Sequence, residues 1–106
     1  MPRDANVFHA ISDPNRRIIL DLLLEEERPV QDIVDHFDMS FQGVSQHLHV
    51  LADAGLVSRR KVGRYRYYRT NSKPLREVYD WVSQYRRFWM DSLDRLDRHL
   101  AGSEKP

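Results

Sequence analysis

Four polar side chains in the segment FQGVSQHLH can form hydrogen bonds and recur at helical spacing. They are Gln42, Ser45, Gln46 and His49. Their positions i, i+3, i+4 and i+7 would place them on one face of a helix. Glutamine can bond bidentately to adenine, and serine can bond to several base edges. The pattern therefore favours hydrogen bonding to nucleic-acid bases, and its alternative is an ordinary solvent-facing helix surface.

Gly43 lies within the same segment and costs a helix about 1 kcal/mol relative to alanine. Its missing side chain would allow the backbone to come close to DNA, although neutral drift explains a glycine equally well. The helix alone does not separate the two interpretations. The basic segment that follows it favours DNA.

Positive charge is concentrated directly after this helix. Residues 54–76 contain six arginines, two lysines and no acid, whereas the whole chain has a formal net charge of +1. Such a local block indicates a polyanionic partner, and a solvated basic surface is the alternative. We expect phosphate or minor-groove contacts from Arg59, Arg60, Lys61, Arg64 and Arg66. These contacts would position the protein and carry little sequence information.

The elements that must position these residues make a mainly α fold with one small β-hairpin. Helical periodicity predicts short helices over 4–11, 14–27 and 30–37, with Asp13 and Pro14 at the start of the second. Its predicted buried face is Ile18, Ile19, Leu22 and Leu23. The fourth helix begins after the N-cap Ser40, buries Val44, Leu48 and Leu51, and ends at Gly55. Strands are expected at 56–62 and 65–70, turning at Gly63, so the order is a helix-turn-helix followed by a wing.

The last predicted element is one long helix from Pro74 to about Leu100, followed by a frayed tail over 101–106. At 1.5 Å per residue this helix is roughly 39 Å long, which is too long for one small body to cover. Its large apolar residues indicate a dimer interface made together with the first helix. Cover for the monomer's own core is the alternative. The predicted interface residues are Val7, Phe8, Val78, Trp81, Val82, Tyr85, Phe88, Trp89, Leu93 and Leu96.

Composition limits the class of protein. The 106 residues fit one domain over 1–106, and 41% hydrophobic with 31% charged residues is typical of a soluble globular chain. The chain has no apolar run near the roughly 18 residues of a membrane helix and no signal-like N-terminus, so we expect a cytoplasmic protein without a membrane partner. It has no cysteine, no phosphate-binding glycine loop and no nucleophile motif, so an enzyme is not expected.

Two runs carry a resemblance to a known family. The run ISDPNRRIILDLL, and SQHLHVLADAGLV followed by a basic strand and YYR, resemble the ArsR family of winged-helix bacterial repressors over about residues 5–100. The resemblance implies a homodimeric repressor that binds a dyad-symmetric operator in double-stranded DNA, usually near its own gene. It also implies DNA-reading positions at Ser40, Gln42, Gly43, Ser45, Gln46, His47 and His49, with wing residues around Arg64.

The sequence departs from the metal-sensing members of that family. The helix before the reading helix, VQDIVDHF, has no cysteine, and Asp97 and His99 on the last helix do not share a helical face. We therefore expect no metal and no cofactor. A small molecule, a partner protein or the protein's own concentration remains open as the signal. A winged-helix protein-interaction module is the alternative function, and the eight basic residues over 54–76 argue against it.

Overall fold

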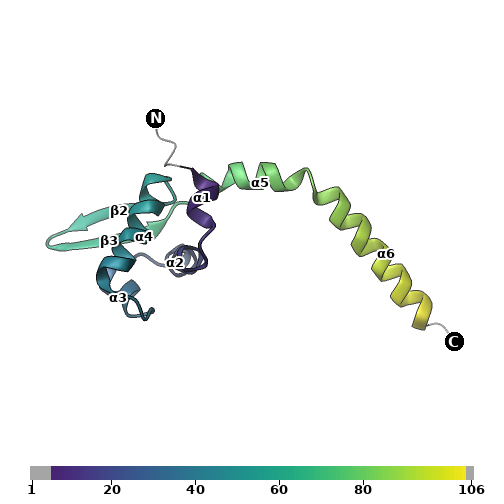
Figure 1. Ribbon diagram of the computed structural model, residues 1–106, viewed down its shortest axis with the longest axis horizontal. Coiled ribbons are helices and arrows are strands. Elements are labelled where there is room, and N and C mark those ends of the chain that lie inside the picture. The colour runs from purple at the N-terminus through teal and green to yellow at the C-terminus, as the bar shows by residue number, and fades with distance from the viewer. Residues whose placement is uncertain (1–5, 105–106) are drawn as a thin grey trace. The chain divides into compact units, whose positions relative to one another are not determined.

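The computed structural model describes residues 6–104, with side chains up to Leu100, and the chain forms two compact units, residues 1–76 and 77–106. The predicted single domain over 1–106 stays a prediction. The elements (Figure 1) follow one another as α1 (Val7–Ile11), α2 (Pro14–Glu25), β1 (Arg28–Pro29), α3 (Val30–Val34), α4 (Phe41–Asp53), β2 (Val57–Val62), β3 (Tyr65–Thr70), α5 (Leu75–Ser83) and α6 (Arg86–Glu104).

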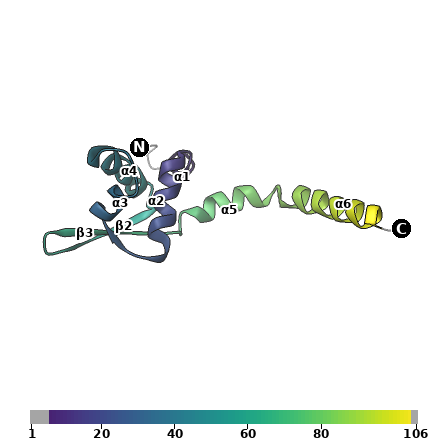
Figure 2. The same ribbon diagram turned by 90° about the horizontal axis from the view of Figure 1, so that it is seen from below.

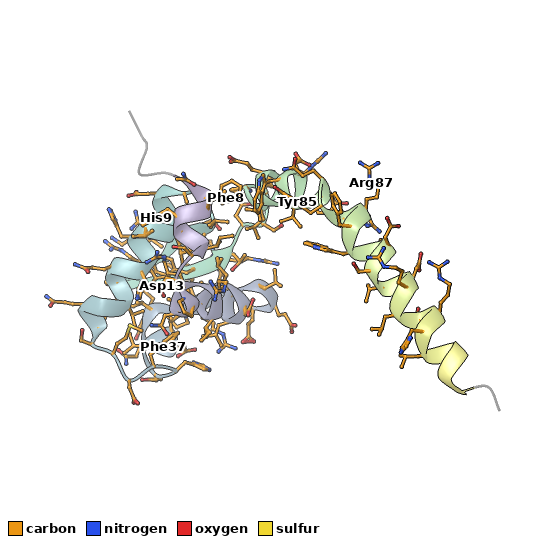
Figure 3. The ribbon with its side chains drawn as sticks, turned by 45° about the vertical axis from the view of Figure 1, so that its right-hand side comes forward. Phe8, His9, Asp13, Phe37, Tyr85 and Arg87 are labelled. Atoms are coloured by element: carbon orange, nitrogen blue, oxygen red, sulfur yellow. The ribbon has the colours of Figure 1, made fainter. Side chains whose placement is uncertain are left out.

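The start of α2 agrees with the prediction. The side chain of Asp13 accepts hydrogen bonds from the backbone N–H groups of Asn15 (2.7 Å) and Arg16 (3.3 Å), and Pro14 is the first helical residue. Burial opposes the ionisation of Asp13, but these N–H donors favour its charged form and lower the pKa of the carboxyl. Figure 3 labels Asp13 between α1 and α2. The helix boundary is therefore encoded by local capping.

The core of the first unit lies between α2, α4 and the start of the hairpin. Its fully buried large side chains are Ile19, Leu23, Ile33, Val44, Leu51 and Leu56. The prediction that Ile18 is buried is wrong, because its side chain is 46% exposed. Leu20 is buried in its place, so the inner face of α2 is rotated from the predicted one. Apolar residues occupy more than one side of α2, and periodicity alone does not select the packed side.

Both ends of α4 follow the predicted signals. Ser40 Oγ accepts a hydrogen bond from the backbone N–H of Gly43 at 3.0 Å. At the other end, Gly55 has φ +75°, Gly55 N donates to Ala52 O, and Leu56 N donates to Leu51 O. This pair of bonds is a Schellman motif, which uses glycine for its left-handed position. The predicted reading helix is thus fixed at both termini.

The sheet contains one strand more than predicted. β2 and β3 pair antiparallel from Val57 opposite Thr70 to Val62 opposite Tyr65. Their two-residue turn has a positive φ only at Gly63 (+62°), as a type II′ turn requires. Arg28 and Pro29, which we expected only to end α2, form β1 against β3 and give the order β1-β3-β2. The hairpin projects past the helices as a wing (Figure 2).

The prediction of one continuous C-terminal helix is wrong, because α5 ends at Ser83 and α6 begins at Arg86. The Gln84 side-chain amide donates to Trp81 O at 3.0 Å, and Tyr85 N donates to Val82 O at 2.9 Å. These bonds replace the regular i to i−4 bonds at the junction. Figure 3 labels Tyr85 there.

The predicted frayed tail falls partly outside the described residues. Its first four residues continue α6 to Glu104, whereas Lys105 and Pro106 are not described. At the other end, residues 4 and 5 of the predicted first helix also lie outside the described range, and α1 begins at Val7 after the N-cap Asn6. No helix within residues 6–104 is both long and apolar enough to cross a membrane.

Candidate nucleic-acid interface

The polar face of α4 lies opposite the buried stripe of the same helix. Gln42, Gln46 and His49 are exposed and Ser45 is half-buried, whereas Val44, Leu48 and Leu51 are buried. The helix therefore presents hydrogen-bonding side chains outward while its other face is held by the core. This is the arrangement that a helix needs in order to enter a groove of DNA.

Two of the residues predicted to read DNA, His49 and Ser40, already have partners within the chain. Nε2 of His49 lies 3.4 Å from a carboxylate oxygen of Asp53, one turn later. The Ser40 hydroxyl caps α4 through Gly43 N. A Cβ added at Gly43 would lie 3.4 Å from Ser40 Oγ and 3.5 Å from Met39 Sδ, which are ordinary van der Waals contacts. Close approach of Gly43 to DNA stays a prediction.

His47 faces the interior of the unit, away from the exposed polar face. Its Nδ1 lies 3.1 Å from a terminal nitrogen of the Arg16 guanidinium, which also donates to Ala10 O at 2.7 Å and to His9 O at 3.1 Å. Within the chain His47 packs against Arg16, and its implied role in reading DNA stays a prediction. The two residues are 31 positions apart in sequence, so short-range spacing could not predict this contact.

The strand register decides which face of the wing packs inward. Lys61 lies opposite Arg66 and Arg59 lies opposite Tyr68. Tyr68 is only 8% exposed, so its face of the hairpin packs against the helices. Lys61 and Arg66 continue that face toward the tip, where both are exposed. The sequence alone leaves this choice of face open.

Arg60 lies on the opposite face of the wing and has a partner. Its Nε donates to Glu27 at 3.0 Å and a terminal nitrogen donates to the same carboxylate at 2.7 Å. The guanidinium carbon also lies 5.8 Å from the Tyr67 ring centroid. Two of its nitrogens are therefore engaged by Glu27, on the face opposite the one that carries Lys61, and phosphate contact by Arg60 stays a prediction.

A groove of about 840 Å³ separates the wing from α3 and the first turns of α4. Phe41 and Ser45 of α4 line it together with three cationic wing residues. Phe41 was not among the predicted DNA-contacting residues, although an aromatic residue outside the apolar stripe of the reading helix is a signal for it. The full lining is Pro29, Val30, Gln31, Asp32, Phe41, Ser45, Lys61, Gly63, Arg64, Tyr65, Arg66 and Tyr68.

The predicted interface residues separate into buried and exposed groups. Val7 is 3% exposed and belongs to the core of the first unit, so it has almost no surface to offer a second copy. Phe8, Val78 and Val82 are half-buried. The others are exposed, namely Trp81, Tyr85, Phe88, Trp89, Leu93 and Leu96.

Side chains that could hold a metal ion do not gather in the described part of the chain. Within residues 6–100, no three or more histidine, aspartate or glutamate side chains come together in a way that could hold one. The sequence contains no cysteine.

Comparison with known proteins identifies relatives of this architecture. A family model described as "Bacterial regulatory protein, arsR family" matches residues 13–59. The transcriptional repressor SdpR of Bacillus subtilis (strain 168) is 42% identical over 77 residues, which are 73% of this chain and 86% of SdpR. An arsenical resistance operon repressor of Staphylococcus xylosus is 35% identical over 80 residues, covering 76% of this chain and 73% of that protein.

A solved structure supports the same relationship. An ArsR-like transcriptional regulator from Rhodococcus sp. RHA1 superposes with a TM-score of 0.66 at 28% identity and covers 90% of each chain. The matched family region contains α2, α3, α4 and the start of β2. The region shared with the family is therefore the helix-turn-helix and the beginning of its wing.

Proposed function

The chain belongs to the ArsR family of bacterial transcriptional regulators, and from this premise we propose that it is a homodimeric repressor of a dyad-symmetric operator. Regulators of this family bind DNA, and the relatives support a transcriptional repressor over an enzyme or a protein-docking module. Beyond DNA binding and repression, we propose that the protein is a dimer, that its operator is symmetric, that it represses its own gene, and that its signal is not a metal. A regulator of the bacterial chromosome would act in the cytoplasm.

One observation carries the assignment of the DNA surface. One residue of the polar face of α4, Ser45, lines the same groove as the wing cations Lys61, Arg64 and Arg66. Amide and hydroxyl groups can read base edges, and the cations can neutralise phosphates beside them. Base readout by α4 and positioning by the wing would therefore meet at this groove.

The second unit supports a dimer. Tyr85, Trp89, Leu93, Leu96 and Leu100 recur at helical spacing from the junction through α6, and each is exposed. A second copy of this chain would bury such a row. Because two-fold symmetry of the protein requires two half-sites, the operator would have dyad symmetry. Two linked reading helices would also bind more tightly than one.

The signal that releases the repressor is proposed to differ from that of arsenic-responsive relatives. The name of the Staphylococcus xylosus relative refers to arsenical resistance. Soft thiolate ligands suit such metal and metalloid ions, and this sequence offers none. A small molecule or a partner protein would then act as the effector, or the protein would respond to its own concentration.

The test is selection of a binding site from random duplexes, followed by fluorescence anisotropy on the selected site, on the DNA upstream of the protein's own gene, and on a scrambled duplex. We expect a symmetric selected site, selective binding that weakens steeply with salt, and no response to added zinc. Selection of no sequence would overturn the DNA-reading function. An asymmetric site bound by one chain would overturn the dimer, and release by zinc would overturn the metal-independent signal.

A further inference from the structure

Phe41 combines an apolar side chain with exposure on the reading helix. It is the first residue of α4 and its side chain is 52% exposed, although Val44, Leu48 and Leu51 of the same helix are almost fully buried. Phe41 lies one helical turn before Ser45, and both line the groove. Only part of the Phe41 side chain is therefore buried, and the residue also lines the groove between α4 and the wing.

Three cations and one acid, Asp32, line this groove, so its net positive charge favours a polyanion such as duplex DNA. Lys61, Arg64 and Arg66 line it and suit phosphate groups, whereas a phenyl ring gains nothing from an anion. In a helix-turn-helix the N-terminal residues of the second helix reach base edges in the major groove. The apolar group that a base pair presents there is the 5-methyl group of thymine, which phenylalanine can contact.

We propose that Phe41 determines specificity by packing its ring against the 5-methyl group of one thymine in each operator half-site. The inference rests on the proposed DNA-binding function and deepens it, because it assigns apolar readout to a helix whose other exposed groups are polar. Gln42 and Gln46 read hydrogen-bonding edges, and Phe41 reads the methyl group that those amides do not recognise.

The experiment replaces thymines of the selected operator with deoxyuridine, one position of the half-site at a time and in both half-sites. Uracil keeps the pairing edge of thymine and lacks only the 5-methyl group. The wild-type chain should lose about fourfold in affinity per half-site at one position, the factor expected for one methyl group removed from apolar contact. Binding is measured by fluorescence anisotropy at fixed salt.

The same duplexes are then tested with variants. The Phe41→Ala chain should bind the thymine and uracil duplexes equally at that position, while Phe41→Leu should keep part of the discrimination. Leu24→Ala is the matched control, since Leu24 is 55% exposed on α2 and does not line the groove. The Leu24→Ala chain should discriminate as the wild type does, and circular dichroism checks that each variant is folded.

Three results would overturn the proposal while leaving the operator binding intact. They are a wild-type chain that is indifferent to every thymine replacement, a Phe41→Ala chain that discriminates as strongly as the wild type, and a selected half-site without thymine. Failure to select any sequence would instead overturn the DNA-reading function itself, and the thymine contact with it. The two failures are therefore distinguishable.

Discussion

A terminal nitrogen of Arg16 on α2 lies 3.1 Å from Nδ1 of His47 on α4 and joins the two helices through their side chains. A guanidinium has donors only, so Nδ1 of His47 is the acceptor in this contact. The same guanidinium donates to Ala10 O and His9 O at the end of α1. One buried side chain therefore links three helices behind the reading face.

Arg16→Ala should lower the free energy of unfolding by about 2–3 kcal/mol, because two carbonyls and His47 lose a charged donor. Urea unfolding at pH 7 measures the change. Arg17→Ala is the control, since Arg17 is exposed and donates to the Ile11 carbonyl oxygen at 2.8 Å. Removing that hydrogen bond should cost no more than about 1 kcal/mol. Equal destabilisation of the two variants would contradict the linking role of Arg16.

Gln46→Ala should relax the preference at one base position of each half-site and weaken operator binding by about 1–3 kcal/mol, because one amide no longer reads a base edge. Repeating the site selection with the variant measures this directly. Gln42→Ala should relax a different position, since Gln42 lies one turn earlier on the same face. An unchanged preference in the Gln46→Ala selection would remove this residue from the reading face.

Arg64→Ala should weaken binding to all duplexes alike and flatten the slope of log affinity against log salt by about one unit for each phosphate that is no longer neutralised. Arg64 is exposed in the turn of the wing and lines the groove. Arg60→Ala is the matched control, because the guanidinium of Arg60 is held by Glu27. Its salt slope should stay close to that of the wild type. Equal flattening in both variants would show that Arg60 leaves Glu27 to bind phosphate.

The ion pair between Glu27 and Arg60 should make part of the stability depend on pH. The hydrogen bonds from Arg60 lower the pKa of the Glu27 carboxyl below its ordinary value of 4.5. A depressed pKa means that the stabilisation is present above pH 4.5 and is lost as the pH falls through the folded-state value. Exposure of the pair keeps the effect small.

Urea midpoints of the wild type and Glu27→Gln, measured at pH 7 and at successively lower pH, should converge in acid. In the Arg60→Ala background the substitution Glu27→Gln should have little effect at any pH. A difference between wild type and Glu27→Gln that persists unchanged in strong acid would assign it to packing, with no contribution from the charge.

Trp89→Ala should shift the protein from dimer toward monomer, because Trp89 offers a large exposed apolar surface on α6, 51% exposed within one chain. Sedimentation velocity over a range of concentrations measures the shift. Leu24→Ala removes an exposed apolar side chain from the first unit and should leave the association unchanged. An unaltered sedimentation profile together with a lower melting temperature would place Trp89 in the core of a single chain.

The local elements could be predicted because their signals lie within a few residues of one another. The Asp13 and Ser40 caps, the glycine that ends α4, the buried stripe of that helix and the glycine turn of the hairpin each depend on neighbours in sequence. The outward face of α4 follows from the same periodicity. Capping and turn geometry are short-range, so a single sequence carries them.

The apolar spacing from Leu75 to Leu100 is continuous and therefore predicted one helix, whereas the structure has two, α5 and α6. Periodicity records which residues share a face, and the residues at the junction keep that periodicity. The break at Gln84 and Tyr85 depends on which donor reaches the carbonyls of Trp81 and Val82. A hydrophobic pattern contains no information about that choice.

The sequence by itself determined the helix-turn-helix, the wing, the concentration of positive charge and the polar row on α4, because these depend on residue type and short-range spacing. Only the tertiary structure determined the orientation and the partners of individual side chains, because these depend on contacts between segments distant in sequence. It turned His47 toward Arg16, directed Arg60 to Glu27, and left Phe41 exposed beside the cationic wing. Side chains of the same type at neighbouring positions differ in role because their partners come from segments distant along the chain.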